Sequence, residues 1–462
     1  MEFDAPTFLE APVSQDMSKP IVATSALTAG QVIFAEAATV ASAGGMEPEQ
    51  GFHEEDCEDE ECDGCAAIDE SDDALEDVLD ESEHDEVSAY VVAHFSELTA
   101  ACESFEALGA SEVRKNLFKV FHLIEVDAKA IDSFLSLDVV ADDVAATLDA
   151  ATGLRDAHPS AIPASLTTDQ VAHLIGVLHK HSIPLEDIGG SGLFFFVSKL
   201  KHSCTPNASY TDAGDAIWVT AIQPIAVGEQ ITVDFFDTHY MCAAERKQVL
   251  TEEGHACACG VCSGTAPDLT RGFKCQVPTC PSGIVHPTNN DVFACTTCDT
   301  VWDAATVAAA VKAEDTLLTE LEVDSVEQVL ELAQNSPLHP FHHIFYSALA
   351  VLLEDSVAEQ NMTEPQALAL MTIQADALNY VVPFPHSEKV SVYDSIAQAH
   401  VEAGDIAKAT EAYALAYQTC INVFGPESKT SIMFKGLVDN TPTNAAEIAA
   451  AYGFDVDDDD DE

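Results

Sequence analysis

The hydrophobic positions along the chain follow two kinds of pattern, and these divide it into segments with different predicted secondary structure. Residues 20–40 hold two short apolar stretches separated by Ala29 and Gly30, which predicts a β-hairpin with a glycine-containing turn. From residue 87 to about residue 178 the apolar spacing is helical, as in YVVAHFSELTAACESF and VRKNLFKVFHLIEV. Helical spacing returns from residue 303 to residue 452, in alanine-rich segments.

Between the two helical regions the sequence pattern predicts short strands. Beyond residue 188 it contains short apolar runs with glycine and proline turns, and IWVTA and QITVDFF are predicted strands joined by the turn-rich QPIAVGE. Hydrophobic residues make up 47% of the 462 residues, which is enough for a core, and the length suggests two to four domains. The predicted fold class is α+β.

The segment SVYDSIAQAHVEAGDIAKATEAYALAYQTCINVFGPES predicts a helix–turn–helix with Gly404 at the turn. Its spacing is typical of tetratricopeptide repeats, which favours a concave surface for protein partners. The alternative is a generic helical bundle that only covers the sheet. The apolar face of this pair consists of Tyr393, Ile396, Ala397, Ala409, Ala412, Tyr413 and Ala416.

The charge balance restricts the partners. The chain has 80 acidic and 18 basic residues, a net charge of −62, which excludes direct nucleic-acid binding and disfavours an anionic membrane surface. Acidic blocks cover residues 47–86 and 454–462. The acid excess suits either attraction to basic proteins such as histones or a solubility feature without a specific partner. We expect no secretory signal in MEFDAPTFLE and no membrane helix.

Cysteines give the strongest chemical signal. Cys257, Cys259 and Cys262 supply three corners of a zinc tetrahedron, and Cys204 in KHSCTPN is the natural fourth ligand. A second set, Cys275, Cys280, Cys295 and Cys298, has the spacing of a zinc ribbon. Both sites are predicted to be structural, because four thiolates leave no open position for water.

A third group of thiols lies inside the first acidic block. Cys57, Cys62 and Cys65 form either a loose metal site or a charged loop with incidental thiols. Cys102, Cys242 and Cys420 are predicted core residues. Clustered rather than scattered cysteines favour zinc in a reducing compartment, so we expect a cytoplasmic and/or nuclear protein.

Three motifs occur in order: KHSCTPNASY, IAVGEQITVDFFD and CACGVC. Together they resemble the SET-domain protein-lysine methyltransferases, and the C-terminal helices point to the SMYD (SET and MYND) branch of that family. The resemblance covers most of residues 18–450. It implies a SET β-fold and S-adenosylmethionine-dependent methylation of a lysine in a histone or another basic protein.

The resemblance also implies roles for individual residues. Lys201 and His202 occupy the Asn-His pair that contacts the cofactor, and Cys204 joins the post-SET zinc. His255 stands where the family often keeps an aromatic residue under the adenine. The cofactor loop corresponds to residues 18–23, with Ile21, Val22 and Ala23 as its contacts, and Phe235 occupies the position of the catalytic tyrosine.

The chain departs from the family pattern at three places. Lys201 replaces the asparagine, Ser18 and Pro20 stand in a loop that is usually glycine-rich, and Phe235 lacks the phenol hydroxyl. Tyr210 or Tyr240 is a candidate substitute for that hydroxyl, and the alternative for either is a ring that serves only packing. Three hypotheses follow: an active protein-lysine methyltransferase, a catalytically inactive SET-fold scaffold that binds basic proteins or partner peptides, and an acidic chaperone-like binder.

The resemblance gives names to the segments. No MYND zinc finger is recognisable, and the acidic block stands in its position. We predict the N-terminal part of the SET domain over residues 18–46, the acidic low-complexity insertion over 47–86, a helical insertion over 87–187, the core SET segment over 188–240, the post-SET zinc and zinc ribbon over 241–302, a helical TPR-like domain over 303–453 and an acidic tail over 454–462.

Overall fold

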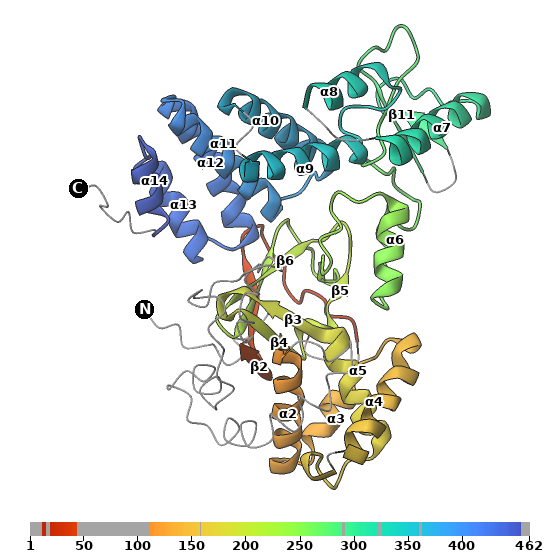
Figure 1. Cartoon of the computed structure of the whole chain (residues 1–462), viewed down its shortest axis with the longest axis vertical. Helices are drawn as coiled ribbons and strands as arrows, with labels where there is room; N and C mark the ends of the chain where they lie inside the picture. Colours follow the sequence, from red (N-terminus) through yellow and green to blue (C-terminus); the bar gives the residue numbers. More distant parts are fainter. Residues whose placement is uncertain are drawn as a thin grey trace, which may run out of the picture. The chain divides into compact units, whose positions relative to one another are not determined.

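The structure is a computed structural model that describes residues 12–14, 19–43, 111–157, 159–288, 292–321, 326–359 and 363–453. The acidic insertion with Cys57, Cys62 and Cys65, the helical pattern at 90–105 and the acidic tail lie outside the described residues. The chain divides into two compact units (Figure 1). Unit 1 comprises Met1–Leu9, Ala35–Lys199 and Asp212–Trp218, and unit 2 comprises Glu10–Phe34, Leu200–Thr211 and Val219–Glu462.

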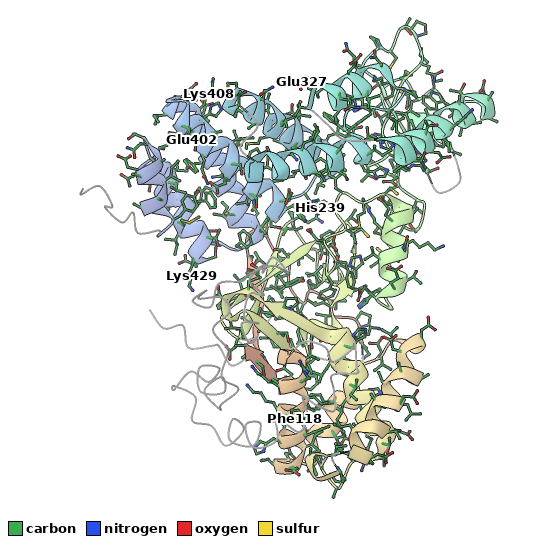
Figure 2. The ribbon with its side chains drawn as sticks, viewed as in Figure 1. Phe118, His239, Glu327, Glu402, Lys408 and Lys429 are labelled. Atoms are coloured by element: carbon green, nitrogen blue, oxygen red, sulfur yellow. The ribbon has the colours of Figure 1, made fainter. Side chains whose placement is uncertain are left out.

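Unit 1 is built around a helical core. Its helices are α2 (Ser111–Val126), α3 (Ala130–Leu135), α4 (Val144–Ala157) and α5 (Thr168–His181). Helix α5 begins at a capping box in which Thr167 and Gln170 satisfy each other's backbone N–H groups. One apolar face of α2, which includes Leu117, Phe118 (labelled in Figure 2) and Phe121, is buried in a cluster shared with α5, which confirms the helical prediction for this stretch.

Short strands make up the β part. They are β1 (Val32–Ala37), β2 (Val40–Ala43), β3 (Ser182–Leu185), β4 (Gly190–Leu193), β5 (Lys201–His202), β6 (Ala208–Ala213), β7 (Ala216–Ala221) and β8 (Thr232–Val233). The sheet orders are β2-β4-β3, β1-β7-β6 and the parallel pair β5-β8. Both predicted strands, IWVTA and QITVDFF, are confirmed in part as β7 and β8, and they pair with other strands rather than with each other.

The hairpin prediction for residues 20–40 is wrong. Val22 bridges to Gln230 and Leu27 bridges to Ile225, whereas β1 joins the sheet with β7 and β6. The two apolar stretches therefore pair with segments about 200 residues away rather than with each other. The glycine turn itself exists, since Gly30 has a positive φ of 79°.

The cysteine-rich part of unit 2 begins with α6 (Ala243–Glu252) and continues into a small antiparallel sheet. That sheet has the order β11-β10-β9, formed by β9 (Phe273–Lys274), β10 (Ile284–Pro287) and β11 (Phe293–Cys295). Phe273 and Phe293 from the sheet share one buried cluster with side chains of α7 (Ala304–Glu320), α8 (Val326–Asn335) and α9 (His343–Glu359). The sheet is therefore anchored on helices and not on its own small core.

Helices continue to residue 451: α10 (Glu364–Val381), α11 (Ser387–Glu402), α12 (Ile406–Val423), α13 (Lys429–Asp439) and α14 (Ala445–Ala451). Helices α11 and α12 form the predicted helix–turn–helix, with Gly404 at a φ of 73° in the turn. The buried cluster of this pair contains Ala397, Ala409 and Tyr413, as predicted. Among the described residues, no helix is both long and apolar enough to span a membrane.

Candidate functional site

His202 is held at the centre of the site by the parallel pair β5–β8. The register places His202 opposite Val233, and the backbone N–H of Phe235 donates to His202 Nδ1 at 3.3 Å. Asp234 Oδ1 lies 3.6 Å from the same nitrogen. The imidazole is 3% exposed, so its orientation is fixed by these contacts. Two motifs about 30 residues apart in the chain therefore meet at a hydrogen bond from the backbone of one to the imidazole of the other.

Phe235 lies among half-buried rings. Its ring centroid is 5.6 Å from Tyr210, 6.4 Å from Phe236 and 6.3 Å from His255. Phe236 contacts His255 at 4.9 Å and His202 at 5.4 Å. Tyr210, Phe235, Phe236 and His255 are only partly buried, and aromatic rings of this kind can bind planar or cationic ligands through their faces.

Residues Ile21, Val22 and Ala23 lie between two neighbouring segments. Ala23 N–H donates to the carbonyl of Glu229 at 2.9 Å, and Ile21 C=O accepts from Ile231 at 2.9 Å. On the other side, Val22 N–H donates to Ser14 Oγ at 3.1 Å. The backbone N–H groups of Val22 and Ala23 are therefore already satisfied within the protein. Ser18 lies outside the described residues.

Lys201 and Asn207 differ in environment. The Lys201 side chain is exposed, whereas Asn207 is 5% exposed. The Asn207 amide donates to the Gln230 carbonyl at 2.8 Å, and its oxygen accepts from Thr232 N–H at 2.8 Å. Asn207 thus ties the end of the HSCTPN motif to the GEQIT segment, which supports the β5–β8 pairing.

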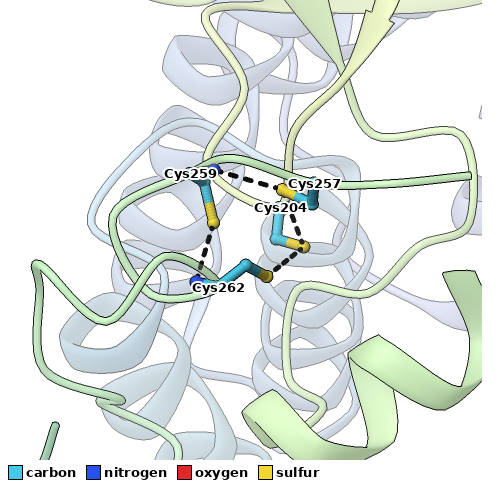
Figure 3. A group of neighbouring side chains, drawn as sticks. All are labelled: Cys204, Cys257, Cys259 and Cys262. Carbon is cyan, nitrogen blue, oxygen red and sulfur yellow. Dashed lines mark hydrogen bonds between the residues drawn. The ribbon is translucent and has the colours of Figure 1, made fainter. Parts of the chain in front are cut away.

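The first cysteine cluster consists of Cys204, Cys257, Cys259 and Cys262 (Figure 3). Cys204 Sγ lies 3.7 Å from both Cys257 Sγ and Cys262 Sγ. Hydrogen bonds from Cys204, Cys259 and Cys262 hold the pKa of Cys257 well below its usual range. His202 Nε2 is 3.4 Å from Cys204 Sγ, so this cluster adjoins the ring site directly.

The second cluster brings together Cys275, Cys280, Cys295 and Cys298 on the β9–β10–β11 sheet. The Sγ atoms of Cys275 and Cys298 are 3.8 Å apart, and those of Cys280 and Cys295 are 3.9 Å apart. Gly283 lies against these sulfurs. A Cβ there would come within 2.5 Å of Cys280 Sγ and 2.7 Å of Cys295 Sγ.

Both clusters have the geometry that zinc requires. Zinc–sulfur bonds of about 2.3 Å in a tetrahedron place the sulfurs about 3.8 Å apart, which agrees with the separations in both clusters. In each, all four sulfurs lie within 4.8 Å of one another. The predicted ligands thus lie together in each cluster, and each cluster could hold a zinc ion.

Among the described residues, three histidine-containing clusters also bring possible metal ligands together. Cys242 with Glu245 and His343 is one of them, and the other two have another explanation. Asp237 Oδ1 lies 2.8 Å from His239 Nδ1 (His239 is labelled in Figure 2) and 3.4 Å from His386 Nε2. His386 Nδ1 accepts the N–H of Glu388, so Nε2 is the ring nitrogen that donates toward Asp237. Hydrogen bonds from His239 and His386 hold the pKa of the Asp237 carboxyl well below its usual range.

The second of these clusters is a buried ion group. Glu314 receives two hydrogen bonds from the Arg271 guanidinium, at 2.7 Å and 2.5 Å, and lies 3.0 Å from His342 Nε2. Burial raises the pKa of Glu314, but the contacts with His342 and Arg271 outweigh it and lower the pKa to about 2. The carboxylate is therefore saturated by its protein partners.

Sequence reasoning missed three residues that the structure places in or beside the sites. Asp234 accepts hydrogen bonds from Phe236 N–H and Thr238 and adjoins His202. Gly283 leaves room for the sulfurs of the second cluster. Asn207 was noted only as part of a motif. A glycine between two CxxC-like pairs is a signal that could have found Gly283.

Comparison with known proteins supports the interpretation of this geometry. Residues 20–236 match the model of the SET domain. The match covers just under half of the 462 residues. The match ends at Phe236, so it includes His202 and Phe235, whereas Cys257 and all later cysteines follow it.

Curated relatives of this SET domain are methyltransferases. The chain is 28% identical over 139 residues to histone-lysine N-methyltransferase set5 of Schizosaccharomyces pombe, covering 30% of the chain and 39% of that protein. It is 34% identical over 73 residues to histone-lysine N-methyltransferase SMYD3 of Homo sapiens, covering 16% and 17%. It is 32% identical over 103 residues to protein-lysine N-trimethyltransferase SMYD5 of Gallus gallus, covering 20% and 24%. The matched segments thus span between 17% and 39% of these relatives.

These similarities confirm the resemblance of the SET domain to SMYD-like protein-lysine methyltransferases. They extend over a minority of each relative's length. The SET domain therefore places the chain beside lysine methyltransferases, while its own activity has to be argued from the residues of the site.

Proposed function

We propose that the chain is an S-adenosylmethionine-dependent protein-lysine N-methyltransferase that acts on a lysine of a basic protein such as a histone. The observation that carries this proposal is the meeting of His202 with Phe235 at the β5–β8 pair, beside the half-buried His255 ring. The printed names of the relatives, which include histone-lysine methyltransferases, support the same reaction. A net charge of −62 favours a basic protein as the substrate.

The residues of the site fit a cofactor of this kind. When bound, S-adenosylmethionine supplies a methyl group on a positively charged sulfur. The Phe236 and His255 rings offer faces for stacking a purine, and the backbone around His202 is held in place by Asp234 and Phe235. Because the Lys201 side chain is exposed, water screens its charge from a cationic ligand.

We also propose two structural zinc ions, one in each cysteine cluster. Thiolate clusters of this kind persist in a reducing environment, which supports a cytoplasmic and/or nuclear location. The α11–α12 pair supports a further proposal, that the C-terminal helices form a TPR-like surface for protein partners.

The competing hypothesis is a SET-fold scaffold without turnover. Two observations favour it: Phe235 lacks the hydroxyl that the family tyrosine provides, and the backbone of Ile21–Ala23 is already occupied by hydrogen bonds within the protein. Such a scaffold would bind basic proteins or partner peptides through its acidic surface and helices.

Calorimetric titration of the full chain with S-adenosylmethionine separates the two hypotheses. We expect binding heat for the wild type and an affinity about 5- to 150-fold lower for His255→Ala, because stacking of a base on a ring contributes about 1–3 kcal/mol. His400→Ala, on helix α11, is the matched control and should bind like the wild type. Absence of heat for the wild type at millimolar cofactor would exclude the enzyme hypothesis.

A further inference from the structure

We propose that Tyr210 supplies the hydroxyl group that Phe235 lacks, with its phenol oxygen accepting a hydrogen bond from the amine of the substrate lysine. This inference rests on the proposed function. It assigns to a residue of this chain the task of orienting the substrate amine for methyl transfer. Its basis is the placement of the tyrosines around Phe235.

Tyr210 lies beside Phe235 in space although 25 residues separate them. The two ring centroids are 5.6 Å apart with an interplanar angle of 41°. Tyr210, Phe235 and His255, which form one group of rings, are all half-buried. The Tyr210 hydroxyl is therefore carried by the ring that lies next to Phe235 in this aromatic group.

The geometry of strand β6 directs Tyr210 toward this group. Successive side chains of a strand point to opposite faces. Ser209 Oγ donates to the carbonyl of Val423 at the end of α12, so Ser209 faces the helices. Tyr210 therefore projects to the other face, where Phe235 lies.

The other candidate tyrosine has a different role. The Tyr240 hydroxyl donates to the carbonyl of Phe341 at 3.0 Å, and its ring stacks on Tyr346 at 3.6 Å with an interplanar angle of 9°. Tyr240 is 7% exposed, and burial raises the pKa of its phenol well above the usual value. Tyr240 is a packed core residue, which leaves Tyr210 as the tyrosine in contact with Phe235.

An acceptor beside the attacking nitrogen would assist the chemistry. In methyl transfer the neutral amine of lysine attacks the methyl carbon, a nitrogen–carbon bond forms, and the carbon–sulfur bond breaks. Its electron pair goes to sulfur, which leaves as the neutral thioether S-adenosylhomocysteine, and the amine proton goes to water. A phenol oxygen that accepts one N–H of the amine turns the nitrogen lone pair toward the methyl carbon.

The first test measures binding without turnover. The probes are S-adenosylhomocysteine and an analogue of the cofactor that carries an amino group in place of the transferred methyl group. We expect Tyr210→Phe to bind S-adenosylhomocysteine like the wild type and to bind the amino analogue about tenfold more weakly, because one hydrogen bond to the amine is lost. Equal affinities of Tyr210→Phe and the wild type for the amino analogue would overturn the assignment.

The second test measures methyl transfer from tritiated S-adenosylmethionine to mixed core histones. Tyr210→Phe should lower kcat about 100-fold or more, as for loss of one preorganised polar group. The double variant Tyr210→Phe/Phe235→Tyr should recover most of the rate, because it returns the hydroxyl from the family position. Tyr240→Phe is the matched control and should keep the wild-type rate.

The outcomes distinguish this inference from the function on which it rests. No transfer by the wild type contradicts the proposed function together with the role of Tyr210. An active wild type whose rate survives Tyr210→Phe contradicts the role of Tyr210 alone. Loss in the single variant and recovery in the double variant support both.

Discussion

The two cysteine clusters of unit 2 have the same sulfur geometry but are assembled in different ways. The second cluster takes all four thiols from residues 275–298, within one small sheet. The first takes three thiols from residues 257–262 and the fourth, Cys204, from a segment more than 50 residues earlier. The second cluster is a local structure, whereas the first joins two distant parts of the chain.

Because the two clusters are assembled in different ways, we expect their loss to have different effects on function. Cys204 is two residues from His202, and its sulfur lies 3.4 Å from His202 Nε2. Zinc in the first cluster would thus fix the β5 end of the candidate site against the loop that carries His255. The second cluster packs with Phe273, Phe293 and Trp302 into the helical core of α7–α9, away from the residues of the candidate site in the sequence. Loss of the first metal should affect the reaction, and loss of the second should affect stability.

The largest expected effects come from removing one thiol from each cluster. Cys204→Ser and Cys280→Ser should each lower the zinc content from two ions per chain to one, since a structural zinc contributes on the order of 10 kcal/mol of binding free energy. Only Cys204→Ser should also abolish binding of S-adenosylmethionine, because it releases the segment that holds His202. Metal analysis and calorimetry on the same samples check both statements.

Cys420→Ala is the control for these variants. Cys420 is fully buried in α12 and belongs to neither cluster, so its replacement should leave the zinc content and cofactor binding unchanged. If Cys280→Ser lost cofactor binding to the same degree as Cys204→Ser, the contrast between a local and a site-linked cluster would be refuted.

A smaller effect concerns the ion group beside the second cluster. Glu314 on α7 has a pKa of about 2, against 4.5 ordinarily. Since its folded pKa is lowered, it contributes stability above about pH 4.5 and loses that contribution as the pH falls toward 2. A shift of this size corresponds to about 3 kcal/mol. We expect the difference in unfolding free energy between the wild type and Glu314→Gln to shrink over this range.

Fluorescence of Trp302 provides the measurement. Trp302 is 8% exposed and stacks on Phe293, so it reports unfolding of this region. The chain has two tryptophans, and Trp218→Phe in both proteins leaves Trp302 as the only one. Acid also releases zinc from the wild type and from Glu314→Gln alike, so that effect cancels in the difference between their unfolding free energies. A difference that stays constant from pH 5 to pH 2 would show that folding does not lower the pKa of Glu314.

The smallest expected effect concerns the space beside the sulfurs of the second cluster at Gly283. Gly283→Ala would place a Cβ within 2.7 Å of two cluster sulfurs. We expect zinc affinity of this cluster to fall about 10- to 100-fold, as for residues that support metal ligands. Gly436→Ala is the control: Gly436 lies in α13 with nothing within 4 Å of an added Cβ. Competition with a chromophoric chelator measures the zinc affinity of both variants. Unchanged affinity in Gly283→Ala would mean that the sulfurs do not close on a metal.

Local spacing predicted the features that are local in the structure. The helical pattern of VRKNLFKVFHLIEV became α2, and the turn at Gly404 separates α11 from α12, because period and turn residues act within a few residues. The close spacings in CACGVC and CTTC predicted that their thiols would lie together. The pattern at residues 20–40 failed for the complementary reason: apolar strands carry no signal of their partner, and these pair with residues 225–230.

The sequence by itself determined which chemical groups the protein has: eight thiols in two clusters, the HSCTPN and GEQITVDFF motifs, and a phenylalanine at residue 235. Only the tertiary structure decided which groups meet. It joined His202 to Phe235 through a parallel strand pair, placed Tyr210 rather than Tyr240 beside Phe235, and left space at Gly283 for the sulfurs. The physical reason is that these contacts depend on strand pairing and packing between segments far apart in the chain, which local spacing does not encode.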